Sequence, residues 1–448
     1  MSGQHVTAPR GRPAFLRVLG SAETLVPLTI LFARVFGAVL GLVLSLVMAR
    51  VMGPHEMGRA LTAMSLAMIL PIFASGSCEI GASRFLTQAL YRNENARAAG
   101  FIRMTWQVAA ICVPVVIVVG ALLCLRISPE DGRTAFLIAV ASAALMGMLR
   151  IGSAHAMGFS RVIVATLPGT FLRPLMLLMF FGIYLLIWSE MPSATVVLIC
   201  FLLSAAVNLA LQQGLLMGNY RSLSGIRRDM SERRGWIAYG LQMGATMLFI
   251  EYSKEVTVLF SSFSLTPADV ASLSVALSFV GFVRFGVVAV NQSITPNLSR
   301  SIAAGDDNRL LQIVDRSTLM KMVPVIGGLL LFGLFGHQLL RLYNAGFEKS
   351  WWLLLLLMAD PLCLAIFGPA ANVLSLTGQQ RRLMIVGIVM LAVLAALVVI
   401  GGYAFGLAGA AIGATLAWTG FYGVLTLLVW REKRVNLTLL GTLARKIR

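Results

Sequence analysis

The chain alternates long apolar stretches with short polar segments over most of its 448 residues. Each apolar stretch is about 20 residues long, the length that an α-helix needs to cross a ~30 Å hydrocarbon layer. The pattern therefore predicts an all-α, multi-pass membrane protein with about twelve transmembrane helices. The predicted spans are 25–48, 57–79, 104–125, 135–156, 163–187, 194–217, 236–260, 268–294, 319–341, 351–376, 383–403 and 407–430.

The second half of the predicted span 236–260, LFIEYSKEVTVLF, carries three charged residues. Glu251 precedes Lys254 by three residues and Glu255 by four, so the three side chains share one helix face. Lys254 can neutralise one carboxylate locally, which leaves the other protonated or facing water. Two interpretations are open: an internal salt bridge that holds the helix against its neighbours, or a proton or sodium site formed by Glu251 or Glu255.

Three arginines also lie well inside apolar stretches, namely Arg34, Arg173 and Arg284. Each is expected to cost about 2.5–3.5 kcal/mol when placed at the centre of a membrane helix, so a polar cavity or a partner is expected for each. The arginine fork suits phosphate oxygens, which predicts a site for an anionic head group. Pairing with a structural acid and snorkelling are the alternatives, and Arg173 precedes Pro174, whose kink frees carbonyls for it to bind.

Further charged residues lie in or near the spans. Asp360 precedes Pro361, which suits either a helix cap or an acid in a cavity. Glu79 is placed to pair with Arg84, and snorkelling is enough to explain Arg150.

The composition fits this assignment, because 58% of the residues are hydrophobic and only 12% are charged. Soluble domains carry about 25% charged residues. The net charge of +18 comes mainly from Lys and Arg in the two tails and the even-numbered loops. This bias predicts that both termini are cytoplasmic, and it accounts for the charge without nucleic-acid binding. Attraction of these Lys and Arg residues to membrane lipid head groups is a further reason for the basic charge.

No motif indicates catalysis. The four histidines and five cysteines are scattered without metal-ligand spacing, and no phosphate-binding loop is present. A membrane glycosyltransferase or polymerase would need a larger external loop. We therefore expect no enzyme activity, no catalytic residue, no metal and no cofactor.

The chain contains two related halves. GPHEMG follows the first span and LTPADVA follows the seventh, and both begin a helix with proline and an acid two residues later. Six spans per half predict two lobes related by an axis along the membrane normal. The predicted divisions are a cytoplasmic tail at 1–23, an N-lobe at 24–217, a connector at 218–235, a C-lobe at 236–430 and a basic tail at 431–448.

Residues 33–86 resemble the opening of the polysaccharide-transport, or Wzx-like oligosaccharide flippase, family of the MOP exporter superfamily. The matching features are a glycine-bearing first helix, Ala49-Arg50, Gly53-Pro54-x-Glu56-x-Gly58 and a second helix that ends before Arg84-Phe85. Residues 294–306 resemble the end of the family's eighth helix, and 368–382, with Leu376-Thr377-Gly378, resemble the end of its tenth.

This resemblance implies a MATE-like fold, with two six-helix lobes around a central cavity. It also implies a flippase that moves a polyprenyl-pyrophosphate-linked oligosaccharide between leaflets of the bacterial inner membrane, for polysaccharide synthesis. Because the lobe interface already supplies a cavity, we expect the carrier to act as a monomer, alone or with polymerase and export machinery. H⁺ or Na⁺ bound by the charged cluster at 251–255 is the candidate coupling ion. A cation-coupled antiporter of drugs or metabolites is the alternative.

Overall fold

The computed structural model describes residues 22–127, 130–343, 345–433 and 437–442. Within these residues the regular elements are all helices, and ten helices are long and apolar enough to cross a membrane. One of the ten, α16 (Gln380–Lys433), contains two helices joined at Phe405 and Gly406, where the backbone leaves helical geometry. A further helix of spanning length, α10 (Arg233–Ser261), carries the predicted charged cluster. The described chain therefore contains the twelve spans that its hydrophobic pattern predicts.

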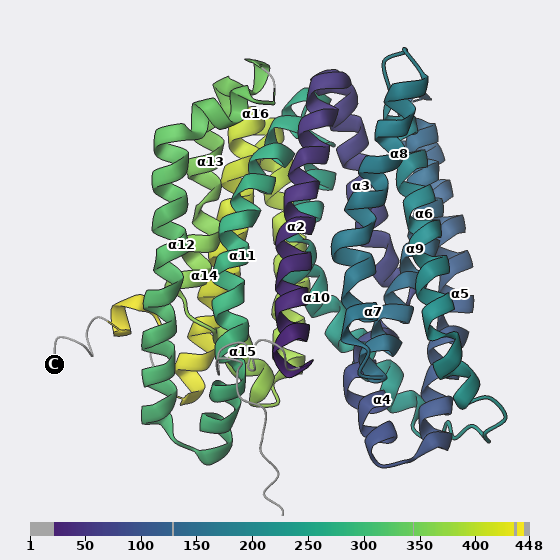
Figure 1. Cartoon of the computed structure of the whole chain (residues 1–448). Helices are drawn as coiled ribbons and strands as arrows, with labels where there is room; N and C mark the ends of the chain where they lie inside the picture. The colour runs from purple at the N-terminus through teal and green to yellow at the C-terminus, as the bar shows by residue number, and fades with distance from the viewer. Residues whose placement is uncertain (1–21, 128–129, 344, 434–436, 443–448) are drawn as a thin grey trace, which may run out of the picture.

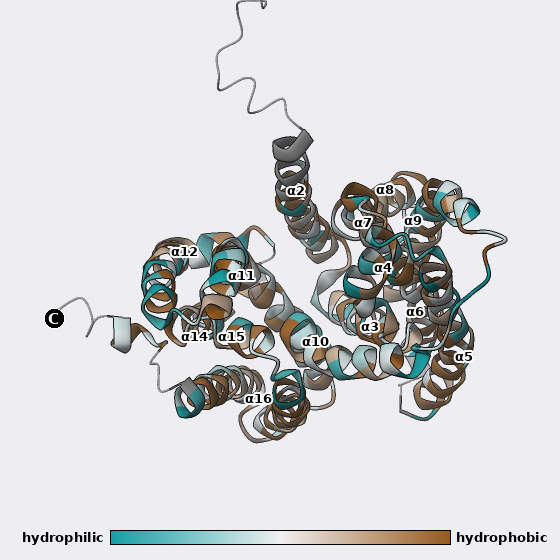
Figure 2. Ribbon diagram, turned by 90° about the horizontal axis from the view of Figure 1, so that it is seen from below, coloured by the Kyte–Doolittle hydropathy of each residue, from teal (hydrophilic) through white to brown (hydrophobic). Residues whose placement is uncertain are grey.

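The first six spans form the N-lobe, which Figure 2 shows as one group of helices with α2 standing at its edge. Its elements are α2 (Ala22–Val51), α3 (Gly53–Ala74), η1 (Cys78–Gly81), α4 (Ala82–Tyr91), α5 (Asn95–Ile127), α6 (Glu130–Gly158), α7 (Val162–Leu167), η2 (Pro168–Leu172), α8 (Arg173–Ile187) and α9 (Ala194–Ser222).

The C-lobe forms the second group in Figure 2 and begins with α10. Its other elements are α11 (Pro267–Ala304), α12 (Asp307–Arg341), η3 (Ala345–Ser350), α13 (Trp351–Leu357), α14 (Ala359–Ile366), α15 (Ala370–Leu376) and α16. Of the predicted tails, 1–23 lies almost entirely outside the described residues, and only 431–433 and 437–442 are described of the basic tail.

Two predicted spans are interrupted rather than continuous. The span at 163–187 contains the π-helical segment η2, in which the amide of Arg173 bonds to the carbonyl of Pro168, five residues earlier. Such an adjustment re-satisfies backbone groups that proline disrupts. The span at 351–376 is divided into α13, α14 and α15, with a left-handed backbone (φ 74°) at Gly368 before α15.

One close contact between the two lobes lies at the upper end of the molecule in Figure 1. There an added Cβ at Gly58 of α3 would lie 1.8 Å from the carbonyl oxygen of Pro267 at the start of α11, so the two backbones are in direct contact. Tyr343 of the C-lobe lies 3.0 Å from the hydroxyl of Ser45, and Arg50 donates to the carbonyl of Leu342. We call this the closed end, and the opposite end, which holds α4 and the start of α2, the terminal end.

Candidate polar cavity between the lobes

The first cavity has a volume of about 470 Å³ and lies toward the terminal end of the N-lobe. It is formed by α3, η1, α4, α6, α7, η2 and α8, and α10 contributes one residue from the other lobe. The charged and polar side chains in its lining are Glu79, Ser83, Arg150, Ser153, Arg173 and Tyr252. Two guanidinium groups and one carboxylate therefore face a space that is otherwise mainly apolar.

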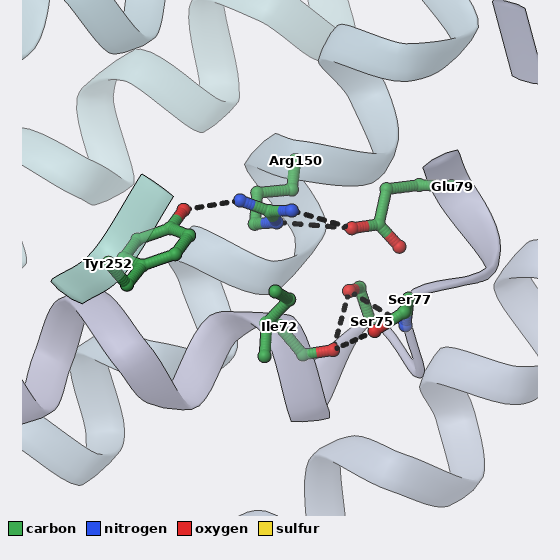
Figure 3. Close-up of polar contacts among 6 residues, drawn as sticks. All are labelled: Ile72, Ser75, Ser77, Glu79, Arg150 and Tyr252. Atoms are coloured by element: carbon green, nitrogen blue, oxygen red, sulfur yellow. Dashed lines mark hydrogen bonds and ion pairs between the residues drawn. The ribbon is translucent and has the colours of Figure 1, made fainter. Parts of the chain in front are cut away.

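Arg150 connects the two lobes across this cavity (Figure 3). Its Nη2 lies 3.0 Å from Oε1 of Glu79, and its Nε donates to the same oxygen at 3.1 Å. Its Nη1 donates to the hydroxyl of Tyr252 on α10 at 2.5 Å. Glu79 is 4% exposed, and its Oε2 has no hydrogen-bond partner among the described residues. The pair therefore leaves one buried carboxylate oxygen able to accept a further donor.

The turn after α3 fixes the position of Glu79. The hydroxyls of Ser75 and Ser77 both donate to the carbonyl of Ile72 at 3.2 Å, which satisfies the last turn of the helix (Figure 3). The backbone of Ser77 adopts a left-handed conformation (φ 55°), and the 3₁₀ segment η1 follows directly. This sharp turn directs Glu79 back toward α6 instead of along the continuing chain.

The predicted partner of Glu79 was wrong. Glu79 pairs with Arg150 on α6, whereas the Arg84 guanidinium lies 5.5 Å from the ring centres of Phe85 and Tyr239. Arg150 is likewise a member of an ion pair rather than only a snorkelling side chain. Sequence spacing favoured the near residue, because the turn that reverses the direction of Glu79 has no simple sequence signal.

Arg173 lines the same cavity, and no ion pair joins it to any of the described residues. It follows the π-helical segment, and its Nη1 donates to the sulfur of Met68 at 3.1 Å. Thioether sulfur is a weak acceptor, so the guanidinium keeps most of its donor capacity. Tyr252 and Glu255 of α10 interact electrostatically with the Arg173 guanidinium.

The second cavity, of about 260 Å³, lies in the C-lobe, and α10 lines it as well. Nε of Arg284 on α11 lies 2.9 Å from Oδ2 of Asp360, and its Nη2 donates to the carbonyl of Ile250 at 3.0 Å. Tyr422 donates to the other carboxylate oxygen at 3.2 Å. Arg284 therefore has the structural acid that the sequence left open as one alternative. Asp360 occupies the first turn of α14, and it also lines the cavity.

The charged cluster of α10 also lines the second cavity. Lys254 donates to the hydroxyl of Ser278 at 3.0 Å, and among the described residues no ion pair joins it to Glu251 or Glu255. Glu255 has one buried oxygen without a hydrogen-bond partner in the described part of the chain. Glu251 is exposed to the cavity and interacts electrostatically with Arg150, Arg34 and Arg284.

Arg34 lies between the lobes rather than deep in either of them. Its Nη1 donates to the side-chain oxygen of Gln292 on α11 at 3.1 Å, which links α2 to the C-lobe. Of the three arginines singled out in the sequence, Arg34 and Arg284 lie within electrostatic range of Glu251, while Arg173 lies in the first cavity with Arg150.

No protein-family model matches the chain, and no curated protein matches its sequence. Solved structures do match. The inward-facing conformation of a multidrug resistance MATE family transporter of the MOP superfamily superposes with a TM-score of 0.73 at 14% identity, covering 89% of this chain and 94% of that one. The chain has the fold of a MOP transporter.

Two further structures extend this similarity. Lipid II flippase MurJ, in an inward closed conformation, gives a TM-score of 0.70 at 13% identity and covers 90% of this chain and 87% of its own. The outward-facing conformation of a multidrug resistance MATE family transporter gives 0.65 at 12% identity, with 95% and 98% covered. The two-lobe MATE-like fold expected from the sequence is thereby confirmed.

Proposed function

We propose that this protein is a flippase that moves a lipid with a pyrophosphate-linked oligosaccharide head group from the cytoplasmic to the outer leaflet. The observation that carries the proposal is the first cavity, where Arg150 and Arg173 face about 470 Å³ of space together with a single carboxylate. Arginine binds phosphate oxygens through paired donors, and a desolvated site strengthens that attraction. Because Glu79 pairs with Arg150, the Arg173 guanidinium leaves the cavity with a net positive charge, which favours an anionic cargo over a cationic one.

The proposed transport occurs by alternating access between the two ends of the molecule. The lobes contact each other at the closed end through Gly58 and Pro267, and toward the terminal end α10 packs against the turn at Ser77, beside which the first cavity lies. The positive-inside distribution of Lys and Arg assigns the terminal end to the cytoplasm. The described conformation then corresponds to a carrier that receives its cargo from the cytoplasmic leaflet.

The second cavity is our candidate for ion coupling. Glu251, Lys254, Glu255 and Asp360 line it with Arg284, and one buried oxygen of Glu255 lacks a hydrogen-bond partner among the described residues. Binding of H⁺ or Na⁺ there would change the charge on the α10 face next to Tyr252, the residue that Arg150 contacts from the other lobe. Ionisable groups inside spans commonly mark such relays.

The cargo of this proposal is a polyprenyl-pyrophosphate-linked oligosaccharide for O-antigen, exopolysaccharide or capsule synthesis in the bacterial inner membrane. The apolar remainder of the cavity lining and the similarity to a lipid II flippase support a lipid-linked substrate. In this role the protein acts without catalytic residues, as a monomer that hands its product to polymerase or export machinery.

A second candidate is a cation-coupled, MATE-type antiporter of drugs or metabolites. The observation that favours it is the charge of the second cavity, where three carboxylates face two cations. An organic cation would be attracted to this cavity, and to the first cavity only weakly. Two of the solved structures with this fold are multidrug transporters.

Reconstitution in proteoliposomes tests the proposal. The purified protein is mixed with a fluorescent polyprenyl-pyrophosphate oligosaccharide, and its exposure to an added sugar-modifying enzyme is followed over time. Arg173→Ala is the informative variant, because its only described hydrogen bond is to a thioether, so the fold should survive. Loss of two charge-assisted phosphate contacts is expected to slow flipping by roughly 10- to 100-fold.

Arg92→Ala serves as the matched control, since Arg92 is an exposed arginine in the loop between α4 and α5. Arg34→Ala tests the link between the lobes in the same assay. An unchanged flipping rate in Arg173→Ala would show that Arg173 does not bind the phosphate of the cargo. No transfer of any lipid-linked sugar, together with proton- or sodium-driven efflux of organic cations, would establish the antiporter instead.

A further inference from the structure

A third cavity lies outside the two already described, at the terminal end of the N-lobe. Its volume is about 310 Å³, and it is formed by the start of α5, the end of α9 and the segment that connects α9 to α10. Its lining includes Ile102, Arg103, Trp106, Tyr220 and Arg228. None of these residues takes part in the proposed transport path.

This cavity continues the apolar outer face of α5. Arg103 stands near the start of the helix, and the following turns expose large apolar side chains on the same side, within about a quarter turn of it. They are Ile111, Ile117, Val118 and Leu125. Because α5 qualifies as a membrane span, this face meets acyl chains, and Arg103 lies where their head groups begin.

Two aromatic residues form rigid walls of the cavity. The hydroxyl of Tyr220 lies 3.0 Å from Nδ1 of His155, and Thr105 lies 2.9 Å from the other ring nitrogen. Trp106 packs edge-on against the same histidine ring. Trp and Tyr concentrate at the boundary between the hydrocarbon layer and the head groups. Their presence therefore places the cavity at the level of the lipid head groups in the membrane.

The cavity carries two positive charges that no described residue neutralises. Arg103 and Arg228 are exposed, and neither forms a hydrogen bond or ion pair with any described residue. The nearby acids have other partners: Glu94 and Glu232 both bind Arg97, and Asp229 accepts the Ser231 amide at 3.0 Å. The amide of Ser231 also lowers the pKa of Asp229. Two free guanidinium groups therefore face a space with no carboxylate in its lining.

We propose that this cavity binds the head group of one anionic phospholipid from the leaflet at the terminal end. Its phosphate would lie between Arg103 and Arg228, with the acyl chains along the exposed face of α5. Basic pockets beside membrane helices recognise anionic lipids in this way. The bound lipid would join α5 to the connector between the lobes, which already bonds to α5 from the Asp229 amide to the carbonyl of Ala96 at 3.0 Å.

Native mass spectrometry of the full-length, delipidated protein tests this site. The protein is titrated with dioleoylphosphatidylglycerol, with dioleoylphosphatidylcholine and with soluble glycerol phosphate. We expect one tightly bound phosphatidylglycerol, and roughly 30-fold weaker binding of it by the R103A/R228A variant, from the loss of two cations near an anionic head group. Phosphatidylcholine and glycerol phosphate should bind far more weakly than phosphatidylglycerol to the unmodified protein.

R300A/R381A is the matched control, because it removes two exposed arginines from the same end of the C-lobe. An equal loss of lipid in both double variants would overturn the proposal, since the attraction would then be general. Equal binding of phosphatidylcholine would also overturn it. If glycerol phosphate displaced the lipid at equal concentration, the cavity would be a site for free anions, and the assignment to a lipid would be wrong.

Discussion

Arg150 and Glu79 form an ion pair, with Nη2 3.0 Å from Oε1, and the same guanidinium also donates to the hydroxyl of Tyr252. One side chain of the N-lobe thus binds a buried acid of its own lobe and a phenol of the C-lobe. The pair lines the first cavity. The Arg150 guanidinium therefore contributes both to the stability of the N-lobe and to the contact between the lobes.

Glu79→Gln should destabilise the protein by about 1–3 kcal/mol, because it leaves the Arg150 charge without its counterion in a partly buried site. Thermal unfolding in detergent measures the change. Glu190→Gln, in an exposed loop, is the control and should have little effect. An equal effect of the two substitutions would mean that the ion pair contributes nothing to stability.

Gly58→Ala should hold the closed end open. An added Cβ would lie 1.8 Å from the carbonyl oxygen of Pro267, so the helices must separate before the side chain fits. The population should shift toward conformations in which the closed end is accessible, as reported by the distance between spin labels on α3 and α11. Gly41→Ala is the control, since no atom lies within 4 Å of its added Cβ. Unchanged distances in Gly58→Ala would contradict the direct contact between these backbones.

Arg284 and Asp360 should be energetically coupled. Asp360→Asn and Arg284→Gln each leave the partner charge unpaired in a poorly hydrated site, so each should lower the unfolding temperature. The double variant should lose less than the sum of the single effects, with a coupling energy of about 1–3 kcal/mol in a double-mutant cycle. Additive losses would show that the two groups act independently.

Lys321→Met should stabilise the protein. Lys321 is completely buried in α12, and its ammonium nitrogen has no hydrogen-bond partner among the described residues. Methionine fills a similar volume without a polar group to desolvate, which should raise stability by about 1–3 kcal/mol in thermal unfolding. Lys349→Met, at an exposed lysine, should change it little. A loss of stability in Lys321→Met would mean that the buried amine serves a role that packing does not explain.

The sequence by itself determined the number, length and approximate bounds of the spans. The reason is that a membrane helix must satisfy its own backbone and match the bilayer thickness, so its signal is local. The break between the last two spans, at Phe405 and Gly406, falls between 383–403 and 407–430 as predicted. The division into two lobes followed from the repeated helix start, whose members Gly58 and Pro267 meet in space.

The tertiary structure alone decided which charges meet. Glu79 and Arg150 are 71 residues apart, and the turn at Ser77 brings them together, whereas spacing in the sequence favoured Arg84. Lys254 sits between two acids in the sequence, yet it donates to Ser278 on the neighbouring helix. The partner of a charged side chain in a span depends on helix rotation and tilt. These are set by packing between helices and not by the pattern along any one of them.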